Sequence, residues 1–182
     1  MTADHTPRPL DETADEILAR RAGSLALETA KEEVTDQISL LLFRIAEEWY
    51  CVRVGDVREI LQEYDVTPIP CVPDYILGVV NVRGEIISIT DAARIMGIGS
   101  VQTSDGAVPS AIVISDEEVV TALLVDEIGD ISAVPNGAIE PPISIIDRTQ
   151  AEFISGSVYI DGAMVGLISI ERVLEPVVAG RH

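Results

Sequence analysis

The chain has 182 residues, of which 47% are hydrophobic and 24% charged, and its 31 acidic and 12 basic residues give a net charge of −19. This is the composition of a globular protein, and so negative a surface argues against nucleic acid and anionic lipid as partners because it repels phosphate groups. No apolar run approaches the roughly 20 residues of a membrane helix, and the first residues lack a signal-peptide pattern, so we expect a cytoplasmic protein without membrane insertion.

Residues 1–37 differ in composition from the rest of the chain. They contain nine acidic and four basic residues, and an alanine-rich helical stretch covers residues 13–34. Leu18, Ala22 and Leu25 share one face of that stretch, which makes only a thin apolar stripe. We interpret residues 1–37 as an extension that is partly helical or disordered. A helix that docks on the domain or on a partner is the alternative.

The next segment predicts two strands followed by a short helix. Residues 38–45 and 49–54 are apolar runs on either side of a polar turn. Asp56 is a suitable N-cap for a helix that ends at Gln62, with Val57, Ile60 and Leu61 on one face.

A connector, a hairpin and a second short helix are expected next. Three prolines within residues 66–73 exclude a central strand and predict an edge or an extended connector. The hairpin follows at residues 76–87, and residues 91–96 form a short helix that ends at Gly97.

This hairpin has a counterpart later in the chain. Gly78 opens a run of branched apolar residues and Gly84 follows six positions later, and Gly156 and Gly162 repeat that spacing 78 positions further on. Asp161-Gly162 is a strong signal for a two-residue turn. A hairpin used twice indicates two related halves. We expect these four glycines to meet requirements of the backbone.

The second half repeats other features of the first. Residues 99–110 have the composition of a linker, and strands are expected at 111–115 and 119–125. The pattern Val125-x-x-Ile128-x-x-Ile131 echoes Val54-x-x-Val57-x-x-Ile60. A short closing helix is expected at residues 170–174, before Pro176. Short strands with closely spaced turns favour small barrels over a parallel sheet.

Catalytic and metal-binding patterns are scarce. The two histidines, His5 and His182, lie at the ends of the chain, so no Ser-His-Asp or Cys-His arrangement is expected, and no lysine follows a glycine as a Walker loop requires. Cys51 and Cys71 have no CxxC spacing and are interpreted as buried apolar residues. We expect no enzyme, cofactor or metal, although the many carboxylates leave an acidic pair or a calcium site open.

One arginine is an exception to this lack of candidate sites. Asn81 and Arg83 flank Val82 at the turn of the first hairpin, where polar residues often serve solubility alone. Arginine is scarce in this acidic chain, however, and its planar guanidinium suits a fixed carboxylate. Glu59 on the expected helix is the candidate partner.

The segment VREILQEYDVTPIPCVPDYILGVVNVRGEI resembles the CheW-like domain, the coupling family of bacterial chemosensory arrays, and ALLVDEIGDI and FISGSVYIDGAMVGLISIERVL extend the resemblance through the second half. It implies a mainly β fold of two tandem five-stranded SH3-like barrels around a shared apolar interface, with short helices. The domain would span residues 38–176, with one subdomain from 38–98 plus a closing C-terminal segment, a second from 108–170, and a tail at 177–182.

The resemblance also implies a function and its partners. Family members are non-enzymatic adaptors that bridge the cytoplasmic tip of methyl-accepting receptors to the regulatory domain of a CheA-type histidine kinase, at membrane-associated arrays. Candidate binding residues carried over from the family are Val57, Glu59, Ile60, Arg83, Ile128 and Ile131, of which Val57, Ile128 and Ile131 are equally compatible with the core. A non-flagellar pathway controlling surface motility or a second messenger is one alternative function, and a cation-binding module is another.

Overall fold

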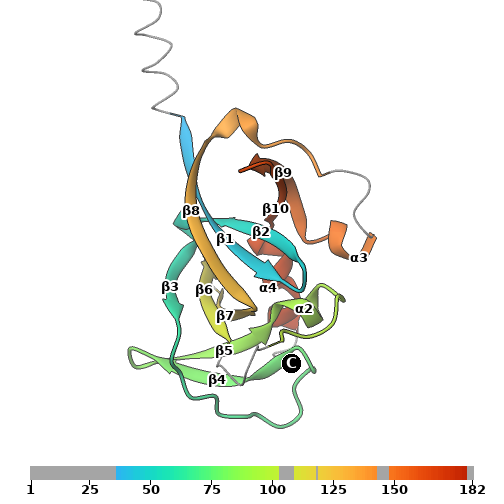
Figure 1. Cartoon of the computed structure of the whole chain (residues 1–182). Coiled ribbons are helices and arrows are strands. Elements are labelled where there is room, and N and C mark those ends of the chain that lie inside the picture. The colour runs from blue at the N-terminus through green and yellow to red at the C-terminus, as the bar shows by residue number, and fades with distance from the viewer. Residues whose placement is uncertain (1–35, 103–108, 118, 143–147, 180–182) are drawn as a thin grey trace, which may run out of the picture. The chain divides into compact units, whose positions relative to one another are not determined.

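Strands dominate the computed structural model of the chain, which describes residues 36–102, 109–117, 119–142 and 148–179 (Figure 1). Residues from Ile38 onward belong to one compact unit, and the description below concerns that unit. The prediction that residues 1–37 form a partly helical or disordered extension concerns a segment that lies almost entirely outside the described residues.

The described strands follow one another in two sets of five, and each set ends in a helix. The first set is β1 (Gln37–Ile45), β2 (Glu48–Arg53), η1 (Val54–Asp56), β3 (Val57–Leu61), β4 (Ile76–Val82), β5 (Glu85–Asp91) and α2 (Ala92–Ile95). The second set is β6 (Ser110–Asp116), β7 (Val119–Val125), β8 (Glu127–Pro135), η3 (Asn136–Ala138), α3 (Arg148–Ala151), β9 (Ile154–Ile160), β10 (Ala163–Ile168) and α4 (Ile170–Ala179).

The strands form two five-stranded SH3-like barrels, as expected. The first barrel has the strand order β8-β1-β2-β10-β9, and the second has β3-β6-β7-β5-β4. The expected division into subdomains at 38–98 and 108–170 is wrong, because each barrel takes two strands from one half and three from the other. The halves interlock because strands of one half pair with strands of the other. β3 is antiparallel to β6, β5 is parallel to β7, and β10 is parallel to β2.

Three apolar clusters explain why β1, β2, β6 and β7 read as nearly continuous apolar runs. Phe43 and Tyr50 of the first barrel and Ile112 and Leu123 of the second lie in one cluster between the barrels. The alternate residues of these strands point into their own barrels, as Cys51 does in the first. Because successive side chains of a strand point to opposite faces, both faces of these strands are buried, and the shared apolar interface is confirmed.

The first glycine of each repeated hairpin makes room for barrel closure. After β3, Thr67 forms an isolated antiparallel β-bridge with Val79. After β8, Glu140 forms the equivalent bridge with Ser157. A Cβ atom on Gly78 would lie 2.3 Å from the Thr67 carbonyl oxygen, and one on Gly156 would lie 2.9 Å from the Glu140 carbonyl oxygen. Both glycines are therefore required by the close approach of another backbone segment. The proline-bearing connector of the first half contains turns at residues 70–71 and 74–75 and meets the hairpin through the bridge at Thr67.

The second glycine of each hairpin serves its turn. Arg83 and Gly84 have φ angles of 54° and 89°, and Asp161 and Gly162 have 50° and 81°. Positive φ at both central residues is the signature of the two-residue turn that matches the twist of hairpin strands. The prediction of two equivalent hairpins, and of a backbone role for Gly84 and Gly162, is confirmed.

The helix expected from Asp56 to Gln62 is wrong. Only a single turn, η1, occurs there, and Val57 to Leu61 form strand β3 with alternating half-buried and exposed residues. The spacing of Val57, Ile60 and Leu61 suits a helix, but seven residues are too few for a stable isolated helix. Antiparallel pairing with β6 satisfies the backbone instead.

The closing helix is longer than expected. α4 continues through Pro176 to Ala179, and Val177 is 1% exposed, so the interpretation of residues 177–182 as a tail is wrong at its start. Val173, Leu174 and Val177 make one buried face against the shared cluster, which holds the helix together past the proline. The Tyr75 hydroxyl donates to the Pro176 carbonyl oxygen at 2.9 Å.

The two cysteines are free, and only one of them matches the expectation of burial. Cys51 is fully buried inside the first barrel, where burial raises the pKa of its thiol to about 12, whereas Cys71 is exposed. Only the thiolate reacts with disulfide reagents. We therefore expect one thiol to react rapidly with such a reagent at pH 8 in the native protein, and two in urea. Replacement of Cys71 by serine should abolish the rapid reaction, and a persisting fast phase in that variant would contradict the burial of Cys51.

Candidate functional site

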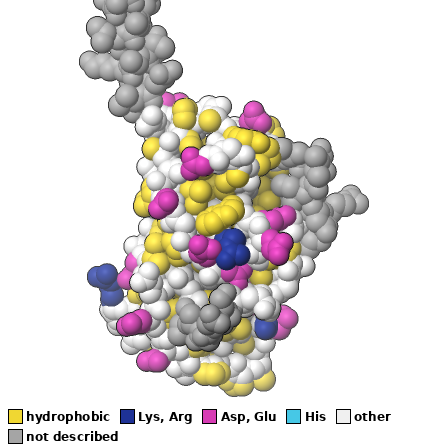
Figure 2. All heavy atoms as spheres, viewed as in Figure 1, with side chains coloured by type: hydrophobic (Ala, Val, Ile, Leu, Met, Phe, Trp, Pro, Cys, Tyr) yellow, Lys and Arg dark blue, Asp and Glu magenta, His cyan; other side chains and the backbone are white. Residues whose placement is uncertain are grey.

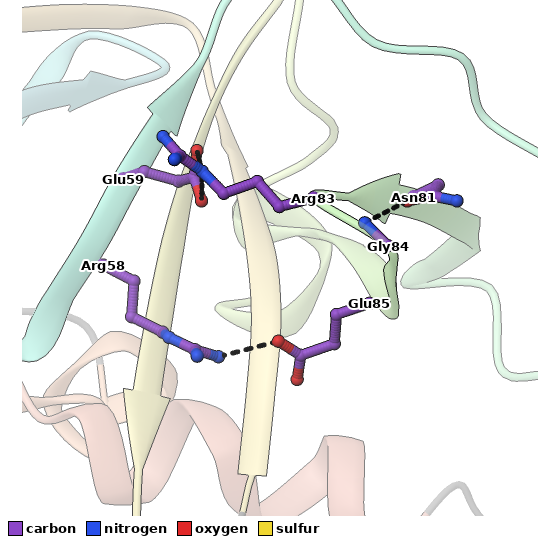
Figure 3. A network of polar contacts seen from close by, with 6 residues as sticks. All are labelled: Arg58, Glu59, Asn81, Arg83, Gly84 and Glu85. Carbon is purple, nitrogen blue, oxygen red and sulfur yellow. Dashed lines mark hydrogen bonds and ion pairs between the residues drawn. The ribbon is translucent and has the colours of Figure 1, made fainter.

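The predicted pair of Arg83 and Glu59 exists, although Glu59 lies on a strand instead of a helix. Arg83 Nε donates to Glu59 Oε1 and Oε2, each at 3.2 Å. In Figure 3 the guanidinium extends from the turn between β4 and β5 to the side chain on β3. The second barrel brings them together because its closure places β3 beside the tip of the β4–β5 hairpin.

A second ion pair and a side-chain hydrogen bond complete this network. Arg58 Nη1 lies 3.2 Å from Glu85 Oε2, which joins β3 to the first residue of β5 (Figure 3). Asn81 Oδ1 accepts a hydrogen bond from the backbone N–H of Gly84 at 2.8 Å, so this side chain supports the turn. Two ion pairs of opposite direction thus fix the hairpin tip against β3.

The exposure of these groups shows what the network can do. The Arg83 side chain is 82% exposed and that of Glu59 26%, while Arg58 and Glu85 are both about half exposed. Exposed ion pairs typically contribute about 0–1 kcal/mol to stability. The network therefore contributes little to the free energy of unfolding. Its main effect is to hold the Arg83 side chain in one orientation at the surface, next to β3.

The apolar candidates on β3 separate into two kinds. Val57 is half-buried and packs against the cluster between the barrels, so it is a core residue at its edge. Ile60 differs from it in exposure, because 39% of its surface is open to solvent. Ile60 is accordingly the apolar candidate on this strand that is open to a partner.

The candidates of the second half lie on β8 and are not part of this network. Ile128 is half-buried against the same cluster as Val57, in agreement with the echo between the two sequence patterns. Ile131 is 61% exposed. Because β8 belongs to the first barrel, Ile131 and Ile60 occupy equivalent positions on different barrels instead of one joint patch.

Sequence reasoning missed the pair of Arg58 and Glu85. A signal for it was present, since Arg58 precedes Glu59 and Glu85 follows Arg83 by two positions, so opposite charges alternate on both segments. Cross-strand pairs of opposite charge are a common way to stabilise neighbouring strands. The wrong helix at residues 56–62 concealed this alternation, because it did not place β3 beside the hairpin.

The remaining surface agrees with the composition. Acidic side chains are scattered over the face seen in Figure 2, with few basic ones among them. In the part of the chain that the structure describes, no group of three or more histidine, cysteine, aspartate or glutamate side chains is placed to hold a metal ion. No helix among the described residues is long and apolar enough to cross a membrane.

Comparison with known proteins shows the family. The family model of the CheW-like domain matches residues 39–177. The chemotaxis protein CheW of Rhizobium meliloti (strain 1021) is 32% identical over 135 residues, which are 74% of this chain and 85% of that protein. Protein PilI of Pseudomonas aeruginosa is 26% identical over 86% of this chain and 85% of its own length.

A solved structure shows the same fold. The crystal structure of the scaffolding protein TtCheW from Thermoanaerobacter tengcongensis superposes with a TM-score of 0.68 at 28% identity, and the match covers 76% of this chain and 92% of that one. This likeness agrees with the family model, which matches most of the same chain. The chain belongs to the CheW-like domain family.

Proposed function

We propose that this chain is a non-enzymatic adaptor that couples the cytoplasmic tip of methyl-accepting chemoreceptors to the regulatory domain of a CheA-type histidine kinase, at membrane-associated arrays in the cytoplasm. The chemotaxis adaptor role follows from the family and its named relatives. The partner domains, the location and the surface used are the proposed part.

The observation that supports a specific surface is the fixed hairpin tip of the second barrel. Arg83 is held by a carboxylate on β3 but keeps most of its guanidinium open to solvent. Ile60 is the next residue of the same strand and is exposed, on the face opposite to Glu59 because successive side chains of a strand alternate. This end strand of the barrel sheet thus offers a partner both a partly paired arginine and an exposed aliphatic residue, and interface hot spots favour arginine together with desolvated apolar groups. We propose that Glu59, Ile60 and Arg83 contact a partner.

The two half-buried candidates, Val57 and Ile128, are not part of the proposed contact surface. Val57 and Ile128 pack against the cluster between the barrels, so substitutions there would disturb the packing of the barrels as well as any interface. They are unsuitable as tests of binding. Ile131 lies outside this surface and is assigned no partner.

We expect Arg83→Ala to weaken binding of a receptor-tip fragment or a kinase regulatory domain about tenfold, the loss typical of an interface arginine. Its free energy of unfolding should change by less than about 1 kcal/mol, because the ion pair is exposed. Isothermal titration calorimetry measures the first quantity and urea denaturation the second. Ile60→Glu should weaken binding to the same partner.

The matched control is Arg172→Ala, which removes another exposed ion pair, Arg172–Glu175 at 3.4 Å on α4. Binding by this variant should equal that of the unaltered protein. Equal affinities for Arg83→Ala and the control would remove the proposed surface but leave the adaptor role. Failure of the unaltered protein to bind either partner at micromolar concentration would contradict the adaptor role itself. If the kinase that binds this chain belongs to a surface-motility system, the alternative, non-flagellar pathway is the correct one.

A further inference from the structure

The two barrels differ at the mouth where a hairpin tip faces the strand at which the chain crosses over from one barrel to the other, which is β3 in the second barrel and β8 in the first. In the second barrel the β4–β5 tip and β3 are joined by the Arg83–Glu59 ion pair at 3.2 Å. In the first barrel the β9–β10 tip and β8 line a hollow of about 430 Å³ instead. The internal repeat allows a position-by-position comparison of the two mouths.

The repeat aligns the Arg83–Glu59 pair with two aspartates. The hairpins are 78 positions apart, which places Asp161 at the position of Arg83. Strands β3 and β8 are 71 positions apart, because Val57 corresponds to Ile128. The same offset places Asp130 at the position of Glu59. The first barrel therefore keeps the carboxylate on its crossing strand but has a second carboxylate where the other barrel has its arginine.

The same alignment accounts for the space. Arg58 and Glu85, the second ion pair of the other barrel, correspond to Gly129 and Ala163. Neither replacement has a side chain long enough to cross the mouth, and both residues line the hollow. The mouth of the first barrel is open because two ion pairs of the other barrel are absent from it.

Trp49 forms part of the hollow, together with Leu42 and Ile128. Its ring packs directly on the backbone of β8, since a Cβ atom on Gly129 would lie 2.7 Å from Trp49 Cζ3. The indole remains half-exposed. The hollow thus combines an aromatic surface with carboxylates, and its volume is at the small end of the roughly 300–1,000 Å³ usual for binding pockets.

Of the three carboxylates that line the hollow, only one has an ion-pair partner in the part of the chain that the structure describes. Glu127, which also lines the hollow, is bonded to Arg44 at 2.9 Å. For Asp130 and Asp161, no basic side chain among the described residues lies within ion-pair distance. Carboxylates without a partner in the described ranges, next to an indole, attract a cation by charge and by the electron-rich face of the ring.

We propose that this hollow is a docking site for an arginine side chain of a partner protein. The bound guanidinium supplies the charge that Arg83 supplies within the other barrel. A planar guanidinium stacks on an indole and donates to two carboxylates at once, whereas the compact ammonium group of lysine does so less well. The site is separate from the Glu59, Ile60 and Arg83 surface, so it does not depend on the function proposed above.

The test uses the fluorescence of Trp49, which is the only tryptophan of the chain. The probe is the peptide acetyl-Gly-Arg-Gly-amide, titrated into the full-length protein to tens of millimolar. We expect a saturable change in Trp49 emission that weakens with added salt, and at least a fivefold weaker response to the lysine peptide. The citrulline peptide, which is neutral and has nearly the same shape, should give no change.

Variants locate the response. Asp130→Asn should weaken it at least fivefold, and the double variant Asp130→Asn/Asp161→Asn should abolish it, while Asp116→Asn at the β6–β7 turn should leave it unchanged. Asp161→Arg should also abolish it by restoring the pair found in the other barrel. Arginine is compatible with that position because Asp161 and Arg83 have φ angles of 50° and 54°. Circular dichroism verifies that each variant is folded.

Three results would overturn the proposal. These are no response to the arginine peptide, an equal response to the citrulline peptide, and an undiminished response in the folded double variant or in the folded Asp161→Arg variant.

Discussion

Replacing Gly78 by alanine should destabilise the protein by about 3–5 kcal/mol, because the steric overlap and the unfavourable backbone angle add to each other. The new Cβ atom would lie 2.3 Å from the Thr67 carbonyl oxygen, and Gly78 has a φ of +149°, which side chains rarely tolerate. Relief of the overlap would require the connector after β3 to move away. The bridge between Thr67 and Val79 that closes the second barrel would then be lost.

Two other glycines are matched controls for this prediction. Gly84 also has a positive φ, +89°, but a Cβ atom added there would meet nothing within 4 Å, so Gly84→Ala should cost only about 1 kcal/mol of strain. Gly55 has open space and no positive φ, and Gly55→Ala should change stability by less than about 0.5 kcal/mol. The measurement is the free energy of unfolding from urea titrations followed by circular dichroism. Equal losses at Gly78 and Gly84 would show that closure of the barrel contributes nothing to the requirement.

Replacing Val177 by aspartate should cost about 4 kcal/mol, because a carboxylate without a partner would be placed in the apolar cluster between the barrels. Val177 is 1% exposed and packs there with Val173 and Leu174 of the same helix. The cluster joins strands of both barrels, so its disruption should affect the unfolding of the whole domain in one transition.

The neighbouring residue provides the control. Val178 is 44% exposed, and Val178→Asp should cost less than about 1 kcal/mol, a value that includes the unfavourable position of a negative charge near a helix C-terminus. Thermal and urea unfolding of the two variants compare the same chemical change on two sides of one helix. Similar stabilities would mean that α4 does not close the core beyond Pro176.

Much of this fold could be predicted from sequence because its signals are local. Alternation of side chains in strands, glycine at positive φ and proline in connectors each depend on a few neighbouring residues. The duplicated glycine pattern identified both hairpins and the two related halves. The Arg83–Glu59 pair could also be predicted, since its chemistry requires only that an arginine and a carboxylate meet.

The conformation of residues 57–61 could not be predicted in this way. Val57, Ile60 and Leu61 have the spacing of a helical face, and the same residues also fit a strand in which Ile60 points to solvent. Pairing with β6, whose residues come much later in the chain, decides between the two by satisfying the backbone hydrogen bonds. Tertiary context of this kind overrides local preference.

The residues of this chain by themselves determined two hairpin-bearing halves, a mainly β fold and an arginine supported by a carboxylate. Only the tertiary structure decided that the halves exchange strands, that Gly78 and Gly156 admit a crossing backbone, and that one barrel mouth is closed by ion pairs while the other is open. The physical reason is that hydrogen bonds between strands of different halves join distant positions, and that the carbonyl oxygens of Thr67 and Glu140 reach the glycines only when the preceding connector folds back on its hairpin. Those contacts exist only once the two barrels have formed around their common apolar core.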